Sequence, residues 1–150
     1  MLNTKNGKIT AMKEITVDHE DENTAELLTA SFENEVNLLS RLEHPNIIDY
    51  YQCKRNKNTL QIYMEYLPGG SLSSIIKEFG VMNKSLVAKF TEQIIKALIF
   101  IHFKGIFLKF WQNLIGFVHR DIKGANILTD NDGIAKLADF GSGVNLKLRG

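Results

Sequence analysis

The sequence predicts an α+β fold in which a small antiparallel sheet is followed by a mainly helical region. Three observations lead to this prediction. The periodicities run in the order strand, helix, two strands, helix and short hairpin, without the regular strand–helix alternation of a parallel sheet. The 150 residues are 44% hydrophobic and 23% charged, which suits one domain with a core and excludes a disordered chain. Pro68-Gly69-Gly70 interrupts the chain between the sheet and the helical region.

The first two elements are a strand over residues 9–17 and a helix over about 24–42. Apolar residues recur at period two in the strand, and they form one stripe at helical spacing in the helix. These residues are Ile9, Ala11, Ile15 and Val17 in the strand and Leu28, Phe32, Leu39 and Leu42 in the helix. The helix is expected to end before Pro45, because the residue preceding a proline is disfavoured in the α conformation.

Two charged residues fall on these apolar surfaces. Lys13 completes the apolar face of the strand, and Glu35 lies within the apolar stripe of the helix. A buried charge without a partner costs several kcal/mol, so one solution is an ion pair between the two elements. The other is that the Lys13 ammonium reaches solvent and Glu35 lies at the edge of the stripe. Periodicity alone leaves both interpretations open.

The later elements are two strands, a short helix capped by Ser71, a longer helix and a hairpin. We expect the strands at residues 47–53 and 60–66, the longer helix at about 85–101, and the hairpin at 127–137. The longer helix has one apolar side, formed by Leu86, Phe90, Ile94, Leu98 and Ile101. Turn-forming residues join the paired strands, namely Lys54–Asn58 and Asp130–Gly133.

Composition and charge exclude several classes of protein. Residues 1–50 carry four Lys or Arg against ten Asp or Glu, whereas residues 51–150 carry fourteen against seven. The basic residues are scattered and do not alternate with aromatic residues, so nucleic acid is not an expected partner. The single cysteine, Cys53, excludes a disulfide framework. The polar start and the charges within the most apolar stretch, 94–118, predict no signal peptide and no membrane partner, and we expect a cytoplasmic protein.

The densest group of chemically useful residues follows position 118. His119-Arg120-Asp121 is followed by Lys123 and Asn126, and Asp139-Phe140-Gly141 comes directly after the predicted hairpin. Because a hairpin returns the chain, we expect Asn126 and Asp139 to face each other. Carboxylate and amide oxygens suit Mg²⁺, which keeps several waters and takes few protein ligands beside phosphate oxygens.

Together these residues resemble the signature of the protein kinases. The matching parts, in order, are Thr10-Ala11-Met12-Lys13, Glu35, His119-Arg120-Asp121 with Asn126, and Asp139-Phe140-Gly141. Three longer segments are similar to MAP kinase kinase kinases, namely Glu35–Ile48, Tyr63–Leu72 and His119–Leu128. The resemblance covers nearly the whole chain. It implies a truncated two-lobe kinase fold, with residues 1–66 as a partial N-lobe and 67–150 as a partial C-lobe.

The resemblance also implies a function and a set of site residues. The function is that of an ATP-dependent serine/threonine kinase with ATP and Mg²⁺ as cofactors and a downstream kinase as its protein substrate. At the nucleotide, Lys13 would hold the α- and β-phosphates and pair with Glu35. Adenine would meet the backbone of Glu65 and Leu67, with Met64 as gatekeeper. At the phosphoryl group, the roles would fall to Asp121 as proton acceptor, Lys123 as charge neutraliser, and Asn126 and Asp139 as Mg²⁺ ligands.

The sequence also departs from the family pattern. No Gly-rich loop is recognisable before Lys13, and the sequence stops nine residues after Gly141, before any Ala-Pro-Glu element. We therefore expect an incomplete kinase domain that is inactive by itself. The alternative is a non-catalytic fragment, either a pseudokinase or decoy or a truncated gene model, that binds a nucleotide or a partner.

A further departure is a surplus of about eleven residues, Ile106–Gly116, between Lys104-Gly105 and Phe117-Val118-His119. One interpretation is a lengthened helix or an apolar surface loop that contacts a partner. The other, which we favour, is a short unspliced intron translated in frame, because removing the segment restores an ordinary kinase junction. Sequencing the mature transcript across these codons distinguishes the two.

Overall fold

The computed structural model describes residues 9–16, 30, 33, 36–37, 39–56, 59–112 and 121–139. The chain divides into two compact units, which are described separately below. Unit 1 comprises Met1–Glu43 and Ile48–Tyr66, and unit 2 comprises His44–Ile47 and Leu67–Gly150. The short segment His44–Ile47 thus belongs to unit 2, although the residues on both sides of it belong to unit 1.

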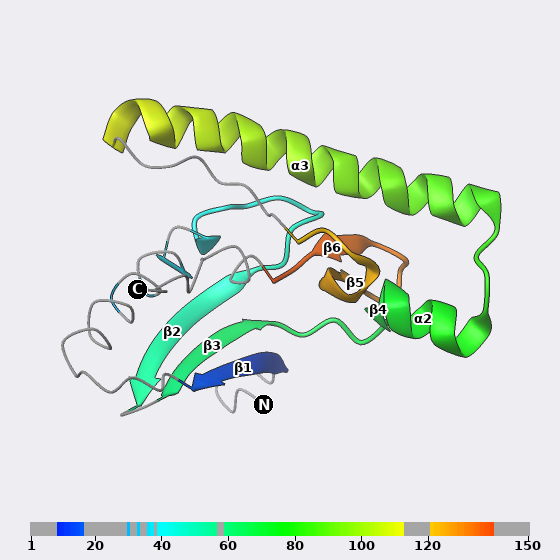
Figure 1. Ribbon diagram of the computed structural model, residues 1–150, viewed down its shortest axis with the longest axis horizontal. Helices are drawn as coiled ribbons and strands as arrows, with labels where there is room; N and C mark the ends of the chain where they lie inside the picture. Colours follow the sequence, from blue (N-terminus) through cyan, green and yellow to red (C-terminus); the bar gives the residue numbers. More distant parts are fainter. Residues whose placement is uncertain are drawn as a thin grey trace, which may run out of the picture. The chain divides into compact units, whose positions relative to one another are not determined.

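Unit 1 contains a three-stranded antiparallel sheet in the order β1-β3-β2 (Figure 1). The strands are β1 (Thr10–Thr16), β2 (Tyr50–Asn56) and β3 (Thr59–Glu65). The predicted strands at 9–17 and 60–66 are therefore confirmed. The predicted strand at 47–53 was placed about three residues too early. Of its expected turn, Lys54–Asn58, residues 54–56 belong to β2, and residues 57–58 lie outside the described residues.

The two faces of this sheet differ in polarity, because side chains alternate along each strand. Lys13 is paired with Ile62, which is itself paired with Cys53, so these three side chains share one face. Ile62 is buried, and burial together with the carboxylate of Glu33 raises the pKa of the Cys53 thiol. The next row, formed by Glu14, Gln61 and Lys54, lies on the opposite face.

The predicted helix of unit 1 is present at the described positions up to Leu39, and residues 40–42, which were expected to belong to it, are not helical: residues 40–41 form a turn. Ala30, Glu33, Val36, Asn37 and Leu39 are helical, and the Ser40 N–H donates to the Val36 carbonyl at 2.8 Å. Leu39 and Leu42, two members of the expected apolar stripe, are buried. The other two members, Leu28 and Phe32, lie outside the described residues, as does Glu35.

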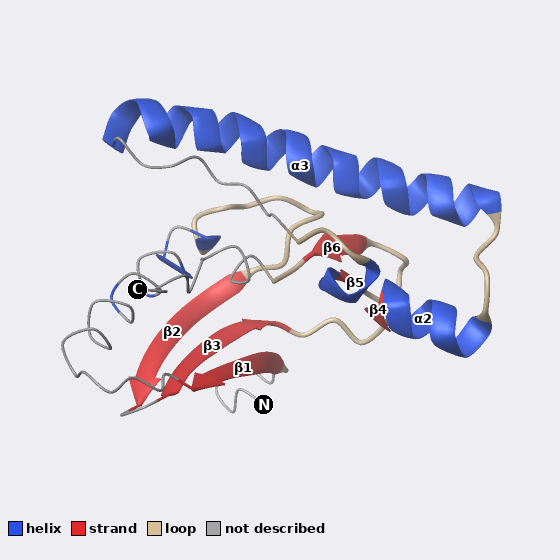
Figure 2. Ribbon diagram, in the orientation of Figure 1, coloured by secondary structure: helices blue, strands red, loops and turns tan. Residues whose placement is uncertain are grey.

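Unit 2 combines a second antiparallel sheet with two helices (Figure 2). The sheet has the order β4-β5-β6, formed by β4 (Gly70–Ser71), β5 (Ile127–Thr129) and β6 (Ala135–Leu137). The helices are α2 (Leu72–Phe79) and α3 (Lys84–Gln112). Ser71 is the N-cap of α2, as expected, because its Oγ accepts a hydrogen bond from Ser74 N at 3.1 Å.

Helix α3 is longer than the pattern predicted. Phe90, Ile94 and Ile101 from its expected apolar side are buried, and Asn83 caps its first turn by accepting from Leu86 N at 2.9 Å. The helix then continues through Ile106–Gln112, so this part of the surplus segment extends α3. The rest of the segment, residues 113–116, lies outside the described residues. Among the residues that the structure describes, no helix is long and apolar enough to span a bilayer.

The β5–β6 hairpin has the predicted turn. The Asp130 Oδ1 accepts hydrogen bonds from Asp132 N at 2.9 Å and from Ile134 N at 2.8 Å, and Gly133 takes a φ of 73°. Few residues other than glycine adopt such a φ without strain, which explains the Asp-Gly pattern. Ile127 is paired with Leu137, so the two ends of the hairpin lie beside each other.

The segment His44–Ile47 packs onto β6. Ile47 forms a parallel bridge with Leu137, and Leu137 N donates to the Asn46 carbonyl at 2.9 Å. His44 stacks on Phe100 of α3 with ring centroids 5.0 Å apart, and its Nδ1 accepts from Asn46 N at 3.0 Å. Burial lowers the pKa of His44, which favours the neutral ring that can accept this bond. The attachment of Ile47 to β6 therefore explains why β2 does not begin at Ile47.

Candidate functional site

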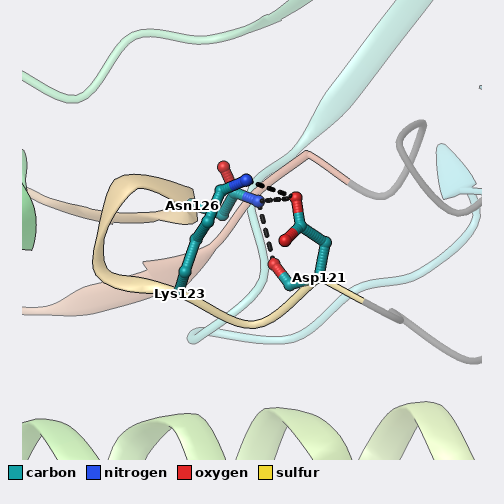
Figure 3. A network of polar contacts seen from close by, with 3 residues as sticks. All are labelled: Asp121, Lys123 and Asn126. Atoms are coloured by element: carbon teal, nitrogen blue, oxygen red, sulfur yellow. Dashed lines mark hydrogen bonds and ion pairs between the residues drawn. The ribbon is translucent and has the colours of Figure 1, made fainter.

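The polar cluster of unit 2 is centred on Asn126, in the short 3₁₀ turn η1 (Gly124–Asn126) between Asp121 and β5 (Figure 3). The Asn126 side-chain amide donates to the Asp121 carboxylate at 3.0 Å and to the Asp121 carbonyl at 2.9 Å. Lys123 Nζ lies 2.7 Å from the same carboxylate oxygen. The Asp121 side chain is 32% exposed, so this ion pair adds little stability but fixes the direction of the carboxylate.

The orientation of Asn126 leaves an oxygen available for a cation. Both groups that its amide nitrogen contacts are acceptors, so the NH₂ group must face Asp121 and Oδ1 must point elsewhere (Figure 3). Asn126 is 6% exposed, and within the described part of the chain its Oδ1 accepts no hydrogen bond. A buried acceptor without a donor is costly unless something binds it. This oxygen therefore fits a Mg²⁺ ligand.

Asp139 lies next to Asn126 because of the hairpin. Ala138 N donates to the Asn126 carbonyl at 2.8 Å, and Asp139 is the following residue. Asp139 has a φ of 62° and is the only non-glycine residue with a positive φ in the described part of the chain. Such a conformation persists only where the surroundings enforce it, and it is frequent at functional sites. The hairpin thus brings the backbones of Asn126 and Asp139 close together, while the expectation that their side chains face each other stays a prediction.

The other expected site residues are divided between the units. Lys13 lies in unit 1 on the half-buried face of β1, and Met64 and Glu65 end β3. The Glu65 N–H donates to the Asp49 carbonyl at 2.9 Å. Leu67 belongs to unit 2 and is buried, and among the described residues its N–H donates no hydrogen bond. Glu35, His119, Arg120 and Phe140-Gly141 lie outside the described residues.

Comparison with known proteins decides the family. The model of the protein kinase domain matches residues 1–150. The chain belongs to the protein kinase family. The resemblance inferred from the motifs is therefore confirmed, and the α+β kinase fold is confirmed with it.

Within the described residues no group of three or more His, Cys, Asp or Glu forms a metal cluster.

The kinase domain is similar to MAP kinase kinase kinases. Mitogen-activated protein kinase kinase kinase 3 of Arabidopsis thaliana is 40% identical over 140 residues, which are 93% of this chain and 21% of the relative. Mitogen-activated protein kinase kinase kinase 3 of Homo sapiens is 39% identical over 143 residues, which are 94% of this chain and 21% of the relative. YODA, another such kinase of Arabidopsis thaliana, is 38% identical over 93% of this chain and 14% of its own length. The chain thus spans 14–21% of these relatives.

Two residues near the site of this kinase domain were not singled out from the sequence. Asn46 and Gln93 have side-chain amides that contact β6 and each other. Gln93 is a polar residue between Phe90 and Ile94 on the buried side of α3, which is the kind of signal that identified Lys13 and Glu35. Asn46 directly follows Pro45, beyond the expected end of the helix, and no local pattern indicates its contact with β6.

Proposed function

We propose that this chain is the nucleotide-binding part of a serine/threonine protein kinase of the MAP kinase kinase kinase type. The reaction is transfer of the γ-phosphoryl group of ATP to a hydroxyl of a protein, and the family as a whole uses ATP and Mg²⁺. The names of the relatives favour a downstream protein kinase as the substrate. The observation that supports the proposal is the Asn126-centred arrangement, in which Asn126 has a buried side-chain oxygen and its amide nitrogen fixes the carboxylate of Asp121.

Each site residue has a role that follows from its chemistry. Asp121 orients the substrate hydroxyl and accepts its proton, while the Lys123 ammonium neutralises charge on the transferred group. Asn126 and Asp139 would hold Mg²⁺, and the ion would supply positive charge that offsets the charge of the phosphates. Positioning and charge stabilisation account for most of the catalysis in such a site.

The nucleotide contacts of the proposal lie mainly in unit 1. Lys13 binds the α- and β-phosphates and is oriented by Glu35. The backbone of Glu65 and Leu67 binds adenine, and Met64 lies behind it as gatekeeper. The Leu67 N–H supports this role, because Leu67 is buried, its N–H donates to no acceptor among the described residues, and a buried donor requires an acceptor.

We further propose that the 150-residue chain, assayed alone, binds ATP without transferring phosphate. These 150 residues contain no recognisable Gly-rich loop that could cover the phosphates and no Ala-Pro-Glu element. Transfer by the purified chain that disappears in Asp121→Asn would contradict this expectation.

The experiment that tests the nucleotide site is calorimetric titration with Mg–ATP of the wild type and of Lys13→Ala. A hydrogen bond to a charged group contributes about 1.5–3 kcal/mol. Lys13 is half-buried, so we expect a loss near the lower limit, roughly tenfold in affinity. The matched control is Lys54→Ala, which removes a lysine from the opposite face of the same sheet and is expected to bind like the wild type. Equal affinities of all three proteins would refute the role of Lys13.

A further inference from the structure

The outer edge of β6 is paired with side-chain amides in place of a neighbouring strand. One edge of β6 pairs with β5. On the other edge, Ala135 N donates to Gln93 Oε1 at 2.6 Å, and the Ala135 carbonyl accepts from Asn46 Nδ2 at 3.0 Å. Leu137 N donates to the Asn46 carbonyl at 2.9 Å. These backbone groups are buried, so each requires a partner, and the two amides supply most of them.

Gln93 is the centre of this arrangement. Its Oε1 accepts from Ala135 N and also from Asn46 Nδ2 at 3.0 Å. Because both of these partners are N–H donors, the oxygen must face them, and Nε2 is left to donate to the Gly133 carbonyl at 3.4 Å. Gln93 thus connects α3 with the start of β6, with the turn that precedes it and with Asn46, whose own carbonyl accepts from Leu137 N at the other end of the strand.

A displacement of β6 would directly change the positions of the proposed metal ligands. Leu137 ends the strand, Ala138 N donates to the Asn126 carbonyl, and Asp139 follows in its left-handed conformation. Such a conformation costs energy in a non-glycine residue, so the surrounding structure contributes to maintaining it. Within the hairpin, β5 supports one edge of β6. The other edge is supported from outside the hairpin, by Gln93 and Asn46.

We propose that Gln93 is a positioning residue for the Asn126–Asp139 pair: its amide oxygen fixes β6 and thereby the place of Asp139. This inference rests on the proposed function, because the position of Asp139 affects binding only if the pair holds Mg²⁺. Gln93 itself touches neither nucleotide nor metal. Its effect should therefore be confined to the gain in ATP affinity that Mg²⁺ produces.

Two substitutions separate the acceptor from the bulk of the side chain. Gln93→Met keeps the length of the side chain and removes the oxygen. Gln93→Glu keeps an oxygen that can accept from Ala135 N and Asn46 Nδ2, and loses only the longer contact with Gly133. Residues that orient a metal ligand typically change metal affinity by 10- to 100-fold. We expect Gln93→Met to lower the Mg²⁺-dependent gain in ATP affinity about tenfold, and Gln93→Glu to restore most of it.

The experiment measures ATP affinity of the full chain with Mg²⁺ and with EDTA, and the hydrogen-exchange rate of the Ala138 amide without nucleotide. Gln61→Met is the matched control, because Gln61 makes its contacts with Glu14 and Tyr63 in unit 1. We expect the Ala138 amide to exchange its hydrogen faster in Gln93→Met, and Mg²⁺ to raise the ATP affinity of this variant less than that of the wild type. In Gln61→Met we expect neither change. If that variant does not fold, Gln93→Asn, which is too short to reach Ala135, replaces it.

The possible outcomes are distinguishable. Three results would overturn the inference while the proposed function stands. The gain in ATP affinity that Mg²⁺ produces could be unchanged in Gln93→Met, or it could fall equally in Gln61→Met. Alternatively, it could be as low in Gln93→Glu as in Gln93→Met. A wild-type chain whose ATP affinity does not depend on Mg²⁺ would overturn the proposed function, and the role of Gln93 with it.

Discussion

In the Asp139→Asn variant, the gain in ATP affinity that Mg²⁺ produces is expected to be about a hundredfold smaller than in the wild type. The variant is expected to bind metal-free ATP at least as tightly as the wild type. The first effect follows because a direct ligand should matter at least as much as the residues that orient it. The second follows because the carboxylate repels phosphate oxygens when no cation lies between them. Asparagine has nearly the same shape and also tolerates a left-handed φ, so the backbone at 62° is not disturbed.

The control for Asp139→Asn is the same substitution in the hairpin turn. Asp132 is exposed, and its described hydrogen bond uses its backbone N–H, so Asp132→Asn should bind Mg–ATP like the wild type. Calorimetric titrations with Mg²⁺ and with EDTA provide all the affinities. If Asp139→Asn loses metal-free and Mg²⁺-dependent binding to the same extent, Asp139 is not a metal ligand.

The Leu137→Ala variant is expected to destabilise unit 2 by about 2–5 kcal/mol. Leu137 is fully buried, pairs with Ile127 of β5 and bridges to Ile47, so its removal leaves a cavity between three segments. A loss of this size is a large fraction of the stability of a typical domain. Urea unfolding followed by circular dichroism measures it.

Ile134→Ala is the matched control for the core, because Ile134 lies in the same hairpin and is 37% exposed. It should cost less than about 1 kcal/mol, since substitutions near the surface have small effects. Equal losses for the two variants would mean that Leu137 is not part of the core that supports Asp139.

The sequence predicts those elements of the fold that depend on residues close together in the chain. Period-two alternation located β1 and placed Lys13 on the face that it shares with Ile62. The Asp-Gly turn located the β5–β6 hairpin and brought Asn126 beside Asp139. In both cases the residues that determine the structure are close in sequence.

The errors and omissions concern contacts between distant segments. Ile47 looks like the start of a strand, but it binds Leu137, ninety positions later, and no local pattern indicates this. The roles of Asn46 and Gln93 depend on the outer edge of β6, which exists only after three segments have met. The expected pairing of Lys13 with Glu35 stays a prediction, because Glu35 lies outside the described residues.

The central claim is that Asn126 and Asp139 hold the metal ion of a bound nucleotide, and replacement of Mg²⁺ by paramagnetic Mn²⁺ tests it most directly. The unpaired electrons of Mn²⁺ broaden the NMR signals of nearby amides. In the isotopically labelled chain with ATP, we predict that substoichiometric Mn²⁺ broadens the amide signals of Asn126 and Asp139 first. Broadening that is the same without ATP, or that begins at the acidic turn of Asp130 and Asp132, would contradict the claim.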